Sequence, residues 1–353
     1  MKIRGKRIIK LNFQSVVPFV AFFVIFLFFT IASYNARTGT FRMLSLYNLT
    51  IVLEQTMQTI IVACGALFVV SQGSSDLSVG VNLGLSAVIS VWAAHATGLP
   101  YIMIPLALIV GLVMGILNGV IVSKFKVPSF MVTLAMLIGV RGLVNYIQVS
   151  LHTQRLPSEL AFLNTPWIKA TIFFVIIIIM AYVFEFTNVG RYSRAIGDNE
   201  TAAKFVGVPV DRMKIIAFAL SGLMAGVGAI FNVVSIDATT ATMGIFLEIR
   251  VIMAVFLGGV LVTGGSTAKF YKILLGSLSI QIIINGLVLI GRGNSHITQS
   301  VQGVLLLLIL LASAIAGTRE NRVKEPPEET VSGAIAEDST QDEEPAEEAD
   351  ANP

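Results

Sequence analysis

The sequence predicts an all-α, polytopic membrane protein of about ten transmembrane helices, and three observations lead to that fold class. The 353-residue chain is 55% hydrophobic and only 13% charged, whereas about 25% of the residues in a soluble domain are charged. Apolar runs of 17 or more residues, long enough to cross a bilayer, recur along the chain. Lysine and arginine gather in alternate intervals between those runs, as is typical of cytoplasmic loops.

Each apolar run is taken in order as one membrane-spanning helix of about 20 residues. The third run follows the polar stretch SQGSSDLSVG and is rich in small residues, and the eighth is short. We therefore expect one broken or re-entrant segment, at one of these two places. The expected spans are 17–33, 51–70, 77–96, 101–122, 129–149, 170–186, 213–234, 247–262, 273–291 and 300–317.

The basic N-terminus sets the predicted orientation. It resembles the start of a signal peptide, but the apolar run at residues 16–32 is long and rich in Phe, and no clean cleavage site follows it. We therefore expect a first span that is retained, with both termini in the cytoplasm. The other segments expected on the cytoplasmic side are the turn with Lys124 and Lys126, the loop 190–212, and the turn with Lys269 and Lys272.

Three parts follow from this topology. Residues 1–16 form a basic cytoplasmic N-terminus, residues 17–317 the transmembrane domain, and residues 318–353 a cytoplasmic tail. From Arg319 onward the chain has 12 acidic and 3 basic residues and lacks aromatic residues. Such a segment buries too little apolar surface to fold, so we expect a disordered spacer, with a regulatory tail as the alternative.

The loop 190–212 contains the signals of one very short helix. Asp198 or Asn199 can cap its start, and Glu200 lies in the first turn, where the helix dipole favours a negative charge. Gly207 can end the helix in the left-handed conformation, and Pro209 prevents continuation. About two turns are too few for a stable isolated helix, so this helix must dock on its own domain or on a partner.

The same loop carries the pattern G-x-N-x-x-A-A-x-x-x-G, which resembles the cytoplasmic loop of ABC importer permeases of the ribose-type sugar class. In that family the short helix fits a cleft on the ATP-binding subunit and transmits its closure. The resemblance therefore implies an ATPase-coupling role, with an interfacial helix on lipid headgroups as the alternative. The coupling residues are Gly197, Asn199, Glu200, Ala202, Ala203 and Gly207.

The stretch GSSDLSVG breaks a helix at membrane depth. Irregular backbone at that depth is tolerated where it is buried in protein or lines a water-filled path. The family form is G-G-x-D-L-S-V-G, which this chain matches from Asp76 to Gly80, whereas Ser74 replaces the second glycine. Asp76 and Ser78 are thus candidates for a gate or translocation path, and Asp76 is equally suited to capping the following helix.

Two arginines stand out in apolar surroundings. Arg141 lies within the expected fifth span, where a charge faces a cavity, a partner or the interface. Arg250 stands where the resemblance predicts Asp in the segment LEIRVIMAVFLGG, which also contains Glu248. The reversed charge leaves open whether Arg250 alters specificity for the solute.

Amide side chains within the spans are the other candidates for the translocation path. Asn285 precedes Gly286 in the middle of the ninth span, as in the resembling family. Asn118, Asn232 and Gln281 also lie within spans. These amides can bind sugar hydroxyls or bond between helices. Two sets of small residues, Gly111-Gly115-Gly119 and Ser221-Gly222-Ala225-Gly226, are interpreted as packing seams.

Several classes of function lack their signatures. The sequence has no G-x-x-x-x-G-K-[ST] phosphate loop and no H-E-x-x-H motif. Its single cysteine, Cys64, lies inside an apolar span, which excludes an internal disulfide. We found no nucleophile–base constellation, cofactor motif or metal-ligand cluster, and no nucleic-acid footprint. The chain is therefore not expected to be an enzyme or to carry a cofactor.

The resemblance implies the membrane permease subunit of an ATP-driven ABC importer in the bacterial cytoplasmic membrane. Its partners would be ATP-binding subunits, a second permease in a homodimer or heterodimer, and an extracytoplasmic sugar-binding protein. A permease of the same fold for nucleosides, a furanosyl signal molecule or branched-chain amino acids is the first alternative. A secondary transporter or channel that works without ATP is the alternative from another class, and Arg141 would be its main mid-span charge.

Overall fold

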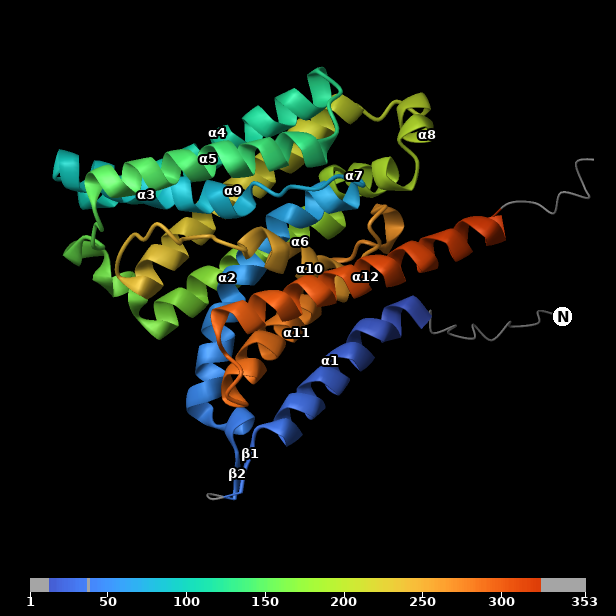
Figure 1. Cartoon of the computed structure of the whole chain (residues 1–353). Coiled ribbons are helices and arrows are strands. Elements are labelled where there is room, and N and C mark those ends of the chain that lie inside the picture. Colours follow the sequence, from blue (N-terminus) through green and yellow to red (C-terminus); the bar gives the residue numbers. More distant parts are fainter. Residues whose placement is uncertain (1–12, 37–38, 325–353) are drawn as a thin grey trace, which may run out of the picture. The chain divides into compact units, whose positions relative to one another are not determined.

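The computed structural model describes residues 13–36 and 39–324, and these residues are almost entirely helical (Figure 1). Two compact units divide the chain at residues 313 and 314. The α-helices are α1 Phe13–Ala32, α2 Leu46–Ser71, α3 Val79–Thr97, α4 Met103–Lys124, α5 Ser129–Leu151, α6 Pro166–Phe186, α7 Asn188–Asp198, α8 Glu200–Phe205, α9 Val210–Ile236, α10 Leu247–Leu257, α11 Phe270–Leu289 and α12 Ser295–Lys324.

Short elements complete the described chain. Strands β1 Tyr34–Asn35 and β2 Thr40–Phe41 pair antiparallel and form a small hairpin between α1 and α2. Single 3₁₀ turns lie at η1 Arg42–Leu44, η2 Pro100–Ile102, η3 Ser158–Asn164 and η4 Gly265–Thr267. An all-α fold class is therefore confirmed for the described residues.

Seven helices, α2 to α6, α9 and α11, are long and apolar enough to cross a membrane. Two further apolar helices, Pro18–Ala32 and Ser295–Leu311, are shorter. The count of ten spans and the cytoplasmic placement of both termini remain predictions. The predictions for residues 1–12 and 325–353 lie outside the described residues, and α12 continues to Lys324, past the expected start of the tail.

The two weakest expected spans have different structures. α3 is one continuous helix of 19 residues. α10 has only 11 residues, or about 16 Å of helix, which is half of a bilayer core of about 30 Å. A non-helical stretch follows α10, and Lys272 of α11 reaches into it, where Nζ donates to the backbone oxygens of Gly259 and Thr267 at 2.8 Å each.

The centre of the transmembrane unit is built around α2, α4 and α9. The C-terminal half of α2 is buried on all sides, as expected for a helix that is apolar all round. The two predicted small-residue seams face each other: a Cβ at Gly115 of α4 would overlap the backbone oxygen of Phe218 of α9, and one at Gly222 would overlap Gly111. Glycine therefore lets the two backbones touch.

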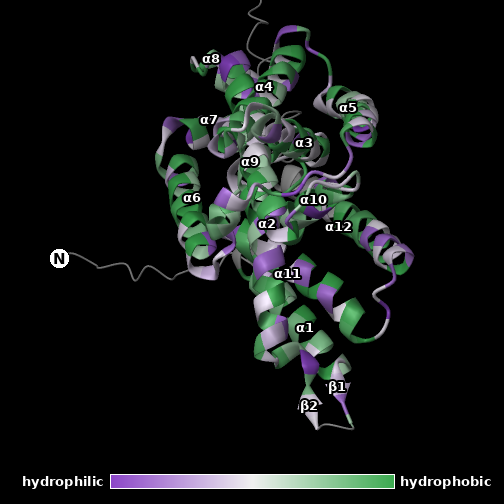
Figure 2. Cartoon of the chain, turned by 90° about the vertical axis from the view of Figure 1, so that its left-hand side faces the viewer, coloured by the Kyte–Doolittle hydropathy of each residue, from purple (hydrophilic) through white to green (hydrophobic). Residues whose placement is uncertain are grey.

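α5 and α6 lie at the periphery. Only 22% of the most apolar window of each helix is buried within the chain, against 78% for α3. Figure 2 shows α6 coloured as hydrophobic along most of its length. An exposed apolar helix of this kind is suited to contact with lipid.

Segments predicted on one side of the membrane meet at one end of the helices. Lys126, after α4, pairs with Asp211 at the start of α9. Gln72, after α2, donates to the backbone oxygen of Met213 at 3.1 Å. At the other end, the ring of His95 lies 2.8 Å from the backbone oxygen of Arg155. This grouping agrees with the predicted alternation of loops.

Candidate functional site

The short helix of the 190–212 loop is α8, and local signals define both of its ends. Asn199 is the N-cap, since its Oδ1 accepts from the backbone N–H of Ala202 at 2.9 Å. At the C-terminus Gly207 has φ +86°, and the N–H of Val208 donates to the oxygen of Ala203 at 3.0 Å. These are the features of a Schellman ending, which stops the helix after two turns.

One side of α8 is docked on its own chain and the other side is open. Ala203 is buried in a small apolar cluster with Ile196, Val208, Val210 and Met213. Glu200 pairs with Lys214 of α9 at 2.8 Å. Phe205 and Val206, in contrast, are 86% and 80% exposed. The helix, which lies at the edge of the fold in Figure 1, therefore presents an unpartnered apolar tip in a polar loop.

A second helix, α7, precedes α8, although the sequence predicted only one helix in this loop. Thr187 caps α7 by accepting from the N–H of Val189 at 3.3 Å. Its last residue, Asp198, does not cap α8, because its Oδ1 accepts from the N–H of Ser266 in η4 at 2.8 Å. Gly197 lies so close to Ser71 and Gly265 that a Cβ would overlap both. The glycine is therefore required by close approach of backbones.

Glu185 ties this loop to α11 and was not singled out from the sequence. Its Oε1 accepts from the N–H of Phe270, the first residue of α11, at 2.8 Å. Its Oε2 accepts from Arg194 of α7 at 3.1 Å, and Arg194 lies 4.9 Å above the ring of Phe184. A carboxylate at a helix N-terminus is stabilised by the free N–H groups and the dipole. The signal in the sequence that could have identified Glu185 is its place as an acidic residue at the end of an apolar run.

Asp76 and Ser78 form a buried polar network between α3, α4 and α9. Oδ1 of Asp76 accepts from the N–H and hydroxyl of Ser78 at 3.0 and 2.6 Å. Oδ2 accepts from Ser221 of α9 at 2.7 Å. Asn118 of α4 donates to the Ser78 hydroxyl at 2.7 Å. Asp76 thus organises the turn before α3 and also connects three helices.

Arg141 lies in a second cluster, where α3, α5 and the start of α10 meet. Its guanidinium donates to the backbone oxygen of Met243 at 2.8 Å. Glu248 of α10 is buried beside Gly80, and a Cβ at Gly80 would overlap its carboxylate. Arg250 is partly buried and donates to the oxygen of Ile245 at 3.4 Å. Both side chains lie against the backbone at residues 245–248 and are near enough to interact electrostatically, but no ion pair joins them in the described structure, as their spacing of two predicts.

Asn285 lies elsewhere, in a cavity of about 940 Å³ between the hairpin, α2 and α11. About one turn before Asn285 on α11, Gln281 donates a hydrogen bond to Gln55 of α2. No hydrogen bond in the described structure joins Asp76, Arg141 and Asn285, so the four predicted path residues occupy three separate places. Asn118 belongs to the Asp76 network, and Asn232 lines none of the described cavities.

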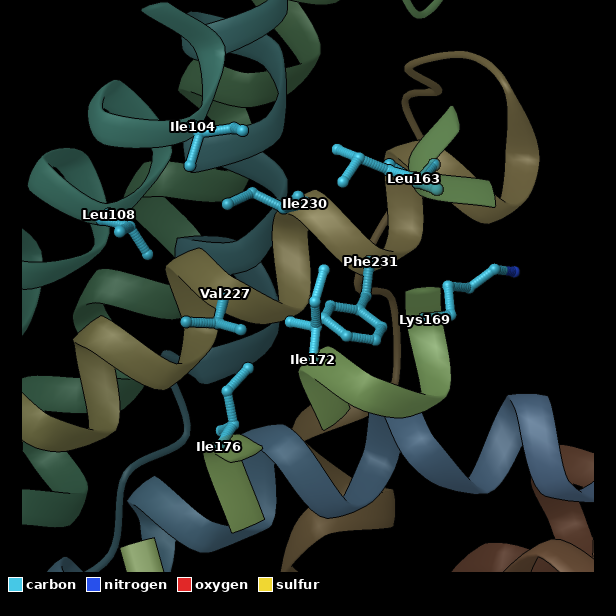
Figure 3. Close-up of a pocket in the computed structure, with 10 residues that line it drawn as sticks. Ile104, Leu108, Leu163, Lys169, Ile172, Ile176, Val227, Ile230 and Phe231 are labelled. Carbon is cyan, nitrogen blue, oxygen red and sulfur yellow. The ribbon is translucent and has the colours of Figure 1, made fainter. Parts of the chain in front are cut away.

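A further apolar cleft of about 290 Å³ separates α4, α6 and α9. Figure 3 shows its aliphatic lining, including Ile104, Leu108 and Ile172, with the amine of Lys169 directed away from it. Lys169 instead contacts Ser235 at 3.3 Å and Glu54 at 3.8 Å. This cleft has no polar group that would orient a solute. Among residues 13–36 and 39–324, no group of three His, Cys, Asp or Glu could hold a metal ion.

A helical membrane protein with a short docking helix at one end, and with a cavity between other helices that has polar side chains in a mainly apolar wall, has the features of a membrane transport subunit. Residues 48–312 match the profile of a protein family described as "Branched-chain amino acid transport system / permease component". That match covers most of the chain, so the chain belongs to this permease family. The resemblance derived from the loop and DLSVG motifs is thereby confirmed at the level of the family.

Curated relatives share most of their length with this chain. It is 30% identical over 282 residues to the ribose import permease protein RbsC of Escherichia coli (strain K12), covering 75% of this chain and 84% of RbsC. It is 32% identical over 272 residues to the autoinducer 2 import system permease protein LsrC of Photorhabdus luminescens, covering 76% of this chain and 82% of LsrC.

A third relative is the probable ABC transporter permease protein YphD of Escherichia coli (strain K12), at 35% identity over 206 residues, which cover 57% of this chain and 61% of YphD. No solved structure gives a significant match to the chain.

Proposed function

We propose that the chain is the transmembrane permease subunit of an ATP-driven ABC importer for a sugar or a related furanosyl solute. Its partners are two ATP-binding subunits, a second permease and an extracytoplasmic binding protein, all in a bacterial cytoplasmic membrane. ATP hydrolysis takes place on the separate subunits. The names of the ribose and autoinducer 2 import permeases support this solute class over branched-chain amino acids.

The observation that carries the proposal is the exposed tip of α8. Phe205 and Val206 project from a loop whose other surface residues are largely polar or charged, and Ala202 beside them is also exposed. A large exposed apolar side chain is the kind of group that anchors an interface between proteins. We assign the tip to a cleft on the ATP-binding subunit, with Asn199, Glu200 and Gly207 holding the helix in shape.

The contacts of α8 and α7 suggest how closure of the ATPases reaches the membrane. α8 is joined to α9 through Glu200 and Lys214. α7 is joined to η4 through Asp198, and through Arg194 it is bonded to Glu185 of α6, which accepts from the first residue of α11. A displacement of the loop would therefore move α9 and α11 together. Alternating access of the paired permeases is the mechanism proposed to follow.

The predicted path residues have separate roles in this proposal. Asp76 and Ser78 hold the turn between α2 and α3 at the end of the helices that faces the ATPases, and would set the position of an inner gate. Arg141 holds the loop before α10 at Met243 and would act on the outer side. Asn285 faces the cavity between α2 and α11 and would contact the solute.

A pull-down of the tagged chain from its native membrane in detergent tests the proposal. We expect a stoichiometric ATP-binding subunit to co-purify. The double variant Phe205→Asp, Val206→Asp should lower that recovery at least tenfold, because truncating an interface anchor costs about 2 kcal/mol or more. Phe125→Asp is the matched control, since Phe125 is also exposed and lies in the turn after α4, which is predicted to face the cytoplasm.

The proposal is overturned if the chain purifies without an ATP-binding subunit. If no ATPase co-purifies and the purified chain moves solute into liposomes alone, the secondary transporter or channel is the correct class. If the double variant retains the ATPase as well as wild type does, α8 is not the coupling element. Unchanged recovery of the ATPase would then favour the alternative in which α8 rests on lipid headgroups. Charge at Ala203 is a poorer test, because Ala203 is buried against its own chain.

A further inference from the structure

The cavity between α2 and α11 has the size and lining of a binding site for a small polar solute. Its volume is about 940 Å³, within the range of small-molecule sites, which is roughly 300–1,000 Å³. One wall is the outward half of α2, the opposite wall is the last turns of α11, and the hairpin with η1 closes a third side. All three elements meet at the end of the helices opposite to α8.

Two amides in this cavity have unused hydrogen-bonding capacity. Asn285 is 7% exposed, yet its side chain makes no hydrogen bond within the described part of the chain, and its Oδ1 is buried without a partner. Gln55 accepts from Gln281 through its Oε1, while its Nε2 donates to no described group. A buried amide oxygen without a partner is destabilising by about 1–3 kcal/mol, so Asn285 calls for an explanation, whereas Gln55 is exposed and its Nε2 is free to bind water or a solute.

The rest of the lining is suited to a neutral molecule with hydroxyl groups. An amide both donates and accepts, as a hydroxyl does, so the two can pair in either direction. Phe41 and Tyr47 supply apolar ring surface, whereas the hydroxyl of Ser45 is already engaged, since it donates to Arg42 and caps α2. Arg42 is the one charged residue among the described lining residues, so the lining offers a charge-assisted hydrogen bond at one place and neutral groups elsewhere.

We propose that this cavity is the outer solute subsite of the transport path and that Asn285 and Gln55 bind the hydroxyl groups of a neutral polyhydroxylated solute there. The inference rests on the proposed function, because only a permease needs such a site beside the membrane. The bond between Gln55 and Gln281 closes the inner end of the cavity. Separating α2 from α11 would break that bond and open the way inward.

Thiol labelling tests whether the cavity is reached by water from outside. The chain has one cysteine, Cys64, and it is 0% exposed, so an introduced cysteine is the only reactive thiol expected. Asn285→Cys and Val288→Cys should react with a membrane-impermeant anionic thiosulfonate applied to intact cells. Asn232→Cys is the control, because Asn232 is a mid-helix amide of α9 whose Oδ1 also lacks a partner, but it lines no described cavity.

Uptake by the assembled importer tests what the cavity binds. Proteoliposomes containing the full complex are given radiolabelled ribose, arabinose or glucose with ATP inside. Asn285→Leu should raise the KM for the transported sugar by roughly threefold to tenfold, the effect of one lost hydrogen bond. Asn232→Leu should leave that KM unchanged. Recovery of the ATP-binding subunit should be the same in both variants, which separates this inference from the proposed function.

Each contrary result has a defined meaning. If the cavity cysteines react only with a lipid-soluble maleimide, the cavity holds lipid and the inference is wrong. An unchanged KM in Asn285→Leu also contradicts it. A wild-type complex that binds the ATPase but takes up none of the three sugars contradicts the solute class. A chain that recovers no ATPase at all refutes the proposed function, while the labelling result still decides whether the cavity is open to water.

Discussion

Two regions hold helices together by different means. One is the seam between α4 and α9, and the other is the loop with α7 and α8. In the seam, backbones touch through glycines such as Gly115 and Gly222, with no room for a side chain. At the loop, a close backbone contact at Gly197 is accompanied by connections through single side chains, from Glu185 at the end of α6 to α11 and from Asp198 to η4. Packed backbones can move only as a unit, whereas hydrogen bonds can be released one at a time. The contacts of the loop can therefore rearrange more easily than those of the seam.

The largest effect is expected from filling the seam. Gly115→Leu would place side-chain atoms on the backbone oxygen of Phe218, so we expect a loss of about 3 kcal/mol or more in stability. The thermal midpoint of the detergent-solubilised chain measures it. Gly139→Leu on α5 is the control, since no atom lies within 4 Å of a Cβ there. Equal midpoints for the two variants would show that α4 and α9 can repack around a side chain at position 115.

A smaller but still large effect is expected from Asp76, the polar connection within the packed region. Asp76→Ala would leave the hydroxyls of Ser78 and Ser221 without their acceptor in a buried site, at a cost of about 2–4 kcal/mol. Asp76→Asn keeps one acceptor oxygen and should lose less. Denaturant unfolding of both variants gives the difference. If both unfold at the wild-type midpoint, the network contributes little and the seam alone holds α3, α4 and α9.

Glu185 should affect transport more than stability. Glu185→Ala removes the acceptor for Phe270 and Arg194, which we expect to cost about 1–2 kcal/mol locally. Uptake should fall several-fold while the ATP-binding subunit still co-purifies, because α8 keeps its exposed tip. Glu159→Ala is the control, an exposed acid bonded to its neighbour Ser158. Full uptake in the Glu185 variant would exclude α7 from the transmission route.

The smallest effect is expected at the cap of α8. Asn199→Ala removes the acceptor for the Ala202 N–H and should destabilise this short helix by about 1 kcal/mol. Amide hydrogen exchange at residues 202–206 should quicken roughly fivefold. Asn294→Ala removes a similar contact, to the N–H of His296, far along the chain and should not change exchange in α8. Unchanged exchange in the first variant would mean that docking of Ala203, not the cap, fixes the helix.

Local signals allowed the elements to be predicted where they were strong. The cap, the glycine ending and the proline bounded α8 almost to the residue, because those residues act on their own backbone. Glycines spaced by four predicted the seam. The weakness of the eighth apolar run predicted a place where α10 is indeed too short to cross a bilayer.

Contacts between distant residues could not be predicted in the same way. Glu185 and Phe270 are 85 positions apart, and no local pattern pairs them. α7 was not predicted, because its sequence is rich in charged residues and resembles a loop. Its amphipathic character becomes clear only from the face that contacts η4. Asn285 was proposed from its mid-span position, but its cavity depends on a hairpin whose two-residue strands are too short to leave a periodic pattern in the sequence.

The short α10 has a consequence for how the chain is made. Its 11 residues give about half the length that a helix needs to enter a bilayer by itself. Lys272, which satisfies the backbone beyond its end, belongs to α11. α10 must therefore wait at the membrane surface during synthesis until α11 emerges, and the two should insert as a pair. A chain truncated after residue 262 and released from the ribosome should leave α10 accessible to protease, whereas a chain that extends beyond α11 should protect it.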